Sequence, residues 1–269
     1  MTDATDPEDL FYIIPKELWA PEATSPSSPC SDPLVMLKQF ADTLSDRKLR
    51  LFAIACCRRV LSLVSDENVR AALEVAARFA DHQATSEELT SAHDVAQRVL
   101  NGFPPLDAEF DALPVPDQDA IEAGRIACWA IVYSTEEQAS EAAEMAAVGA
   151  ASARAWEYRL SCGPSVLGAA RDRAADMGSE WEQQCQIEML RDMFHRPSDL
   201  SNQRRDAIPG AVRTFAEMIY EQQSFMRMKE LAAVIEQAGE CPQPIVDHCI
   251  APGPHVRGCW TLDWILGRE

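Results

Sequence analysis

The fold is decided by the stretch Ser45-Asp46-Arg47-Lys48-Leu49-Arg50-Leu51-Phe52-Ala53-Ile54-Ala55-Cys56-Cys57-Arg58-Arg59-Val60-Leu61. Ser45 or Asp46 can accept hydrogen bonds from the first backbone amides, and this predicts the start of a helix. The residues that follow are apolar around most of the middle of that helix and not only along one stripe. Because a helix that is apolar all round lies inside a protein, we predict that this one is central and buried.

Helical spacing of apolar residues continues on both sides of this stretch. A helix is predicted over 66–82, and the run Thr85-Ser86-Glu87-Glu88 is typical of a capping-box start. Further helices are predicted over 33–44, 86–100, 117–194 with a break at 162–164, 211–220, 224–237, 242–248 and 258–266. Gly239 is predicted to end the helix over 224–237. Because no convincing strand pair occurs, the predicted fold class is all-α, an irregular multi-helix domain of about ten to twelve helices.

Proline and acidic residues divide this helical chain. Residues 1–32 carry several prolines and a Ser-Pro-rich run, so they are predicted to form an irregular N-terminal arm. Residues 101–117 are acidic and proline-rich and are predicted to form a long loop. This loop separates a predicted N-terminal helical subdomain, residues 33–100, from a predicted C-terminal helical subdomain, residues 118–269.

Small residues mark one close contact between helices. Alanines recur at spacings of three and four, at Ala139, Ala142, Ala143, Ala146, Ala147, Ala150 and Ala153. Such a stripe lets a second helix approach closely. Gly149 lies in the same run although glycine costs about 1 kcal/mol of helix propensity against alanine, which also indicates close approach.

The charge balance limits the classes of partner. The chain has 24 basic and 43 acidic residues and a formal net charge of -19. Such a field repels phosphate groups, so we expect neither nucleic acid nor membrane as a partner. The five bases within 46–59 are predicted to form the basic rim of a helix, and the acids within 101–150 a solvated face. The alternative interpretation is a docking surface for a basic partner.

Cysteine use and the N-terminus predict the compartment. The first residues lack an apolar run of signal-peptide length, and no stretch approaches the roughly 20 apolar residues of a membrane helix. We therefore expect a cytoplasmic protein. Its nine cysteines are expected to be reduced thiols, most of them buried.

The end of the chain concentrates reactive and metal-binding side chains. His248, Cys249, His255, Arg257 and Cys259 form the candidate functional cluster. Cys259 begins a predicted helix, where the helix dipole favours a thiolate, and the nearby histidine and arginine favour it further.

Several interpretations of this candidate cluster stay open. His255, Arg257 and Cys259 can form a thiol-dependent enzyme site, or a small-ligand or anion site with the helix amides. The histidines and cysteines can instead bind structural zinc, although their spacing departs from the usual patterns and no Cys-x-x-Cys occurs. Trp260 and Trp264 favour simple packing of a terminal helix into the core. The sequence therefore assigns no catalytic residue, metal ligand or cofactor.

The leading functional prediction is a non-enzymatic one. No P-loop, dinucleotide-binding glycine motif, His-Glu-x-x-His or Gly-x-Ser-x-Gly occurs. Strong helical patterning without a complete catalytic set favours a cytoplasmic helical interaction or regulatory module that binds one or more proteins.

Several blocks of the chain also resemble a known group of sequences. These are Leu37, Ser45–Arg59, Leu190-Arg191-Asp192-Met193-Phe194, Ala216-Glu217-Met218-Ile219-Tyr220, His248-Cys249 and Gly253–Trp260. They resemble an uncharacterised family of bacterial proteins, often present in many copies per genome. The resemblance covers most of residues 33–269, while the arm before residue 33 departs from it. It implies a helical domain and no established activity.

Overall fold

The computed structural model describes residues 32–40, 44–163, 165–166, 168–194, 197, 200, 208–239 and 241–268. Within these ranges the chain forms twelve α-helices and two short 3₁₀ helices and no strand, which confirms the predicted all-α class and helix number. The predicted irregular arm lies outside the described residues except for Asp32. None of the described helices combines the length and apolarity that a bilayer span requires.

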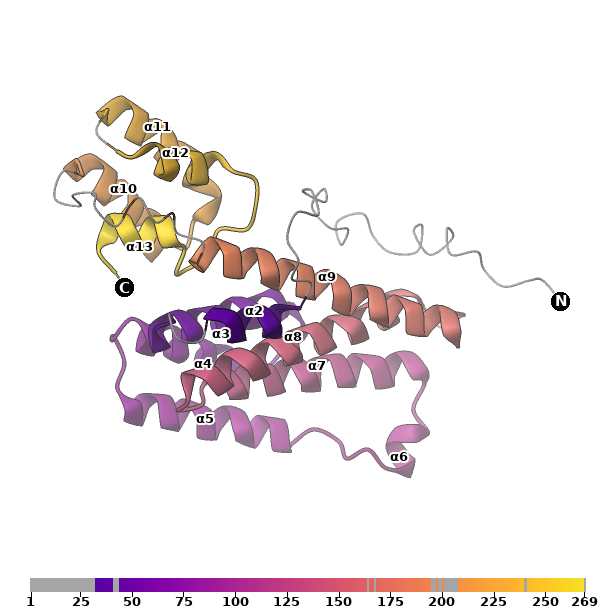
Figure 1. Ribbon diagram of the computed structural model, residues 1–269. Helices are drawn as coiled ribbons and strands as arrows, with labels where there is room; N and C mark the ends of the chain where they lie inside the picture. Colours follow the sequence, from indigo (N-terminus) through magenta and orange to yellow (C-terminus); the bar gives the residue numbers. More distant parts are fainter. Residues whose placement is uncertain are drawn as a thin grey trace.

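The first eight helices form a bundle (Figure 1). They are α2 Pro33–Phe40, α3 Asp46–Arg59, α4 Glu67–Ala80, α5 Ser86–Asn101, α6 Ala108–Asp111, α7 Val115–Ser134, α8 Ala139–Ser161 and α9 Ala169–Phe194, with the 3₁₀ helix Leu61–Leu63 after α3. Helix α8 packs against α3, α7 and α9, and α4 packs against both α3 and α5. The bundle is therefore built around the pair α3 and α8.

Four further helices form a C-terminal layer, coloured orange to yellow in Figure 1. They are α10 Gly210–Glu221, α11 Met228–Ala238, α12 Gln243–Ile250 and α13 Trp260–Leu266, with the 3₁₀ helix Phe225–Arg227 before α11. The layer lies at the carboxyl end of α9, where α13 contacts that helix. As predicted, Gly239 ends α11 in the left-handed conformation, with φ +75°.

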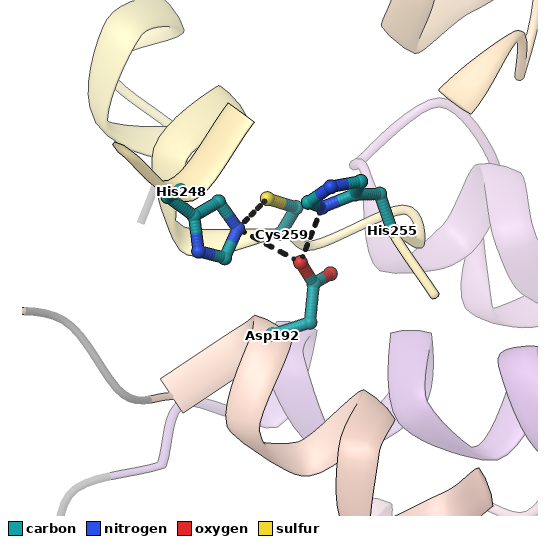
Figure 2. A group of neighbouring side chains, drawn as sticks. All are labelled: Asp192, His248, His255 and Cys259. Carbon is teal, nitrogen blue, oxygen red and sulfur yellow. Dashed lines mark hydrogen bonds and ion pairs between the residues drawn. The ribbon is translucent and has the colours of Figure 1, made fainter. Parts of the chain in front are cut away.

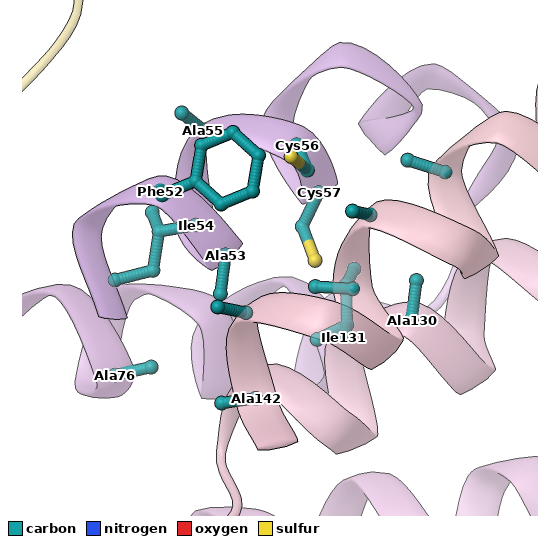
Figure 3. Packing of buried hydrophobic residues seen from close by; sticks show 14 of the residues in the cluster. Phe52, Ala53, Ile54, Ala55, Cys56, Cys57, Ala76, Ala130, Ile131 and Ala142 are labelled. Carbon is teal, nitrogen blue, oxygen red and sulfur yellow. The ribbon is translucent and has the colours of Figure 1, made fainter. Parts of the chain in front are cut away.

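The predictions for α3 and its neighbours are confirmed at the level of local structure. Ser45 Oγ accepts a hydrogen bond from the Lys48 amide at 3.3 Å and caps α3. Residues from Leu51 to Cys57 are buried, and Figure 3 shows the side chains of Phe52 to Cys57 close to those of Ala76 on α4, Ile131 on α7 and Ala142 on α8. The capping box predicted at Thr85 and Glu88 starts α5.

The predicted basic rim of α3 is wrong for two of its five members. Arg47 and Arg50 are only 8% and 5% exposed. Arg50 donates to the carbonyl oxygens of Glu136 and Glu137 and lies over the Phe79 ring, 4.9 Å from its centroid. A long side chain can bury its charge where carbonyl and carboxylate oxygens accept its hydrogen bonds. The spacing of charged residues in the sequence does not reveal such an environment.

The predicted close contact through the alanine stripe is confirmed. Every alanine of the stripe is buried along α8. A Cβ added at Gly149 would stand 2.6 Å from Ala130 Cβ and 2.9 Å from Trp129 Cε3 on α7. The glycine is needed because the two helices approach too closely there for any side chain.

The buried residues divide into two main groups, and the division differs from the predicted subdomains. One group runs from Met36 to Met193, on both sides of the predicted loop 101–117. The other runs from Leu200 to Ile265 in the C-terminal layer. The predicted loop itself carries α6 and the start of α7. The boundary between the two hydrophobic cores therefore falls after α9, close to the candidate functional cluster.

An ion network joins the two cores. Arg47 on α3 donates to Asp81 at 2.9 Å, to Asp263 on α13 at 2.9 Å and to the Tyr220 hydroxyl on α10 at 2.6 Å. Two further cations complete it: Lys48 reaches Asp263 at 2.7 Å, and Arg257 reaches Asp81 at 2.8 Å. These six residues, here called the α3 ion network, hold the C-terminal layer against the bundle.

Candidate metal centre

Four side chains from separate parts of the chain meet where α9 faces the C-terminal layer. They are Asp192, His248, His255 and Cys259, here called the four-residue cluster (Figure 2). One ligand atom from each residue lies within 4.8 Å of the ligand atoms of the others.

The local structure explains how the cluster forms. Asp192 lies in the last turn of α9, and His248 lies in the last turn of α12. The chain then turns through Pro252–Pro254 and brings His255 back toward α9. Cys259 occupies the N-cap position of α13. One helix end, one loop and two short helices are thus tied together at this point.

Hydrogen bonds connect the four side chains directly. Asp192 Oδ1 lies 2.9 Å from His248 Nε2 and 2.8 Å from His255 Nδ1. His248 Nε2 also lies 3.2 Å from Cys259 Sγ. The second carboxylate oxygen, Oδ2, accepts from the Val256 amide at 3.0 Å. Oδ2 is therefore held by the backbone, and Oδ1 faces both imidazoles and the sulfur.

The other ring nitrogen of His248 also has a partner. Trp260 Nε1 donates to His248 Nδ1 at 3.1 Å, and the two ring centroids are 4.7 Å apart. An indole nitrogen is a donor only, so Nδ1 must offer its lone pair. In a neutral ring the proton then sits on Nε2, which donates it toward the cluster.

Hydrogen bonding sets the charge state of the acid, and burial sets that of the thiol. Burial alone raises the pKa of Asp192, but hydrogen bonds from His248 and His255 outweigh it and hold that pKa below its ordinary value. Burial and the charge of Asp192 raise the pKa of the Cys259 thiol well above its ordinary value. Without a cation the cluster therefore contains one carboxylate and one protonated thiol.

The donor set fits a divalent ion of the zinc type. One thiolate, two imidazoles and one carboxylate suit zinc and its neighbours, whereas calcium and magnesium prefer oxygen alone. Ligands held about 2.0–2.3 Å from zinc lie roughly 3.3–3.8 Å apart, so small side-chain shifts would close the shell. The two charges of the ion would balance the Asp192 carboxylate and the Cys259 thiolate.

Access to the cluster runs past the histidines. The His248 side chain is 17% exposed and that of His255 is 10% exposed, while Asp192 is at 5%. Cys259 is fully buried. An ion would therefore enter from the imidazole side, and the sulfur would lie deepest.

Three of the five sequence candidates enter the four-residue cluster and two do not. Cys249 is buried in the core of the C-terminal layer, and burial raises the pKa of its thiol to about 12. Arg257 turns to Asp81 at 2.8 Å and lies over the Tyr220 ring, 4.8 Å from its centroid. His255, Arg257 and Cys259, on which the thiol-enzyme and anion-site alternatives are centred, therefore do not meet at one solvent-facing point.

Asp192 is the member that sequence reasoning missed. It precedes His248 by 56 residues, so no local spacing connects the two. A weak signal was present, since Asp192 is an acid among the apolar residues Leu190, Met193 and Phe194 at the end of a helix. An acid on a buried helix face needs a partner, but the sequence does not say which.

Comparisons with family models, curated proteins and solved structures found no match to this chain.

Proposed function

We propose that this protein is a helical metal-binding protein in which the four-residue cluster holds one zinc-type divalent ion. The ion has a structural role: it fastens the C-terminal layer to α9. The observation that carries this proposal is the convergence of four different ligand atoms within 4.8 Å of one another.

The ligand count favours a structural site over a catalytic one. Catalytic zinc usually keeps a position open for water or substrate, whereas structural zinc has four protein ligands. The four-residue cluster supplies all four, and its sulfur is fully buried. The Val256 amide on Asp192 Oδ2 is the type of outer contact that orients a metal-bound carboxylate.

The same geometry counts against the thiol-enzyme alternative. A catalytic cysteine needs an accessible thiolate, whereas Cys259 is buried and its pKa is raised. The proposed role therefore stays within the non-enzymatic class expected from the sequence and adopts its zinc alternative. A reduced thiol ligand also suits a cytoplasmic protein.

Cobalt substitution provides the test. The full chain is purified under reducing conditions, stripped with a chelator and titrated with Co²⁺. We expect the strong visible bands of a four-coordinate site and a sulfur-to-cobalt charge-transfer band, both displaced by one equivalent of Zn²⁺. Cys259→Ser removes the charge-transfer band. The matched control is Cys249→Ser, which changes a buried thiol in the same segment and leaves the band in place.

Two outcomes contradict the proposal. A chain that takes up neither Co²⁺ nor Zn²⁺ has only a hydrogen-bonded cluster of Asp192, His248 and His255. Loss of the band in Cys249→Ser with retention in Cys259→Ser would assign the sulfur ligand to the other cysteine.

A further inference from the structure

The position of the His248 proton bears on metal binding, and the inference drawn from it rests on the proposed function. In the structure His248 Nδ1 accepts from Trp260 Nε1 at 3.1 Å, so the proton of a neutral ring is on Nε2. Nε2 is also the atom that faces Asp192 Oδ1 and Cys259 Sγ. A metal can bind Nε2 only through its lone pair, and the proton there must first leave.

If the His248 ring stays neutral, the proton that leaves Nε2 must be carried by Nδ1. A metal-bound histidine normally donates its second N–H to an acceptor. Trp260 presents an N–H at that position, so two donors would face each other across the 3.1 Å that separates them now. The indole must therefore withdraw from His248 when the ion binds.

Withdrawal of the indole is not a free side-chain motion. Trp260 is 4% exposed and is the first residue of α13. The same short helix carries Asp263, which binds Arg47 and Lys48 in the α3 ion network. A shift of Trp260 thus acts on the helix that joins the two cores.

We infer that Trp260 gates this metal centre: its indole N–H holds His248 in the tautomer that cannot bind a metal, and ion binding requires that contact to break. The gate couples occupancy of the site to the seating of α13. Trp260 is a positioning residue in this scheme, since it acts through His248 and does not bind the ion.

The proposed gate predicts that removal of the Trp260 indole N–H increases the affinity for zinc. Trp260→Phe removes the N–H and leaves His248 Nδ1 able to carry its proton, so zinc should bind about 2–10-fold more tightly, the equivalent of one ordinary hydrogen bond. Affinity is measured by competition with a chromophoric chelator. Trp264→Phe is the matched control, because it removes a buried indole from the same helix outside the four-residue cluster, and it should leave the affinity unchanged.

A second measurement uses the unaltered chain, so the test survives if Trp260→Phe fails to fold. In the ¹⁵N spectrum of the assigned indole groups, zinc should shift the Trp260 N–H resonance, while the Trp264 resonance stays in place. Equal or weaker zinc affinity in Trp260→Phe, or an unmoved Trp260 resonance in a zinc-loaded chain, overturns the gate and leaves the metal centre standing. Absence of zinc binding in every chain overturns the proposed function itself.

Discussion

At Gly258 the loop that carries His255 and leads to Cys259 packs directly against the bundle. Its φ of +94° lies in the left-handed region, and an added Cβ would stand 2.8 Å from Met193 Cε and 3.1 Å from Leu51 Cδ1. Lys48 Nζ also donates a hydrogen bond to the Gly258 carbonyl oxygen at 2.6 Å. The backbone at this residue therefore fixes how close Cys259 can come to α9.

We expect Gly258→Ala to lower the free energy of unfolding by about 2–3 kcal/mol, since a left-handed alanine costs about 1–2 kcal/mol and overpacking adds to it. The matched control is Gly267→Ala, where φ is +69° but no atom lies within 4 Å of the added Cβ. It should lose only the backbone cost, about 1 kcal/mol. Urea unfolding measures both. Equal losses would show that the neighbours of Gly258 make room freely.

The residue scale is also where sequence reasoning reached its limit. The types of side chain in the terminal segment predicted chemistry there, and His248, His255 and Cys259 do meet. Their direction depends on other elements: Asp192 draws the histidines toward α9, and Asp81 draws Arg257 away. No periodicity within one segment encodes a partner that lies on another helix.

Helix α3 shows how one element can serve two cores. Its middle fills the bundle, while its first turn places Arg47 between Asp81 and Asp263. Burial alone lowers the pKa of Arg47, but the hydrogen bond and charge of Asp263, with Tyr220 and Asp81, outweigh it and raise that pKa. The guanidinium therefore stays charged and binds both carboxylates.

Removal of this buried cation should cost far more than removal of a partly exposed one. We expect Arg47→Met to lower the free energy of unfolding by about 3 kcal/mol, because two buried carboxylates lose a shared partner. Arg58→Met on the same helix is the control: Arg58 pairs with Glu74, whose side chain is 55% exposed, and the loss should stay below about 1 kcal/mol. Urea denaturation of the two variants compares them, and similar losses would contradict the importance given to the α3 ion network.

The ends of the helices were predicted better than the contacts between helices. Caps at Ser45 and Thr85 and the stop at Gly239 follow from local hydrogen bonding and backbone preference, so the sequence alone was enough. The burial of Arg47 was not predicted, because it depends on residues 34 and 216 positions away along the chain. A charged residue at a helix start looks the same in sequence whether its charge is hydrated or paired with a buried carboxylate.

At the scale of the whole molecule, two hydrophobic cores are joined by polar contacts. The bundle core ends at Met193 and the second core begins at Leu200, and the four-residue cluster and the α3 ion network both lie at this junction. The predicted boundary at 101–117 followed composition, whereas the cores follow packing between distant helices. A junction of this kind can open without unfolding either core, because local openings cost less than global unfolding.

Metal binding should therefore protect the junction more than the bundle. At free zinc about 100 times the dissociation constant, the bound form gains about 2.7 kcal/mol, which slows exchange through junction opening about 100-fold. Hydrogen exchange should slow in α12, in α13 and at the end of α9, while α4 and α5 stay unchanged. Asp192→Asn, which keeps the shape but loses a charged ligand, should show no zinc effect. Equal protection of every helix would mean that the two cores open together, and the ion would then stabilise the molecule as one unit.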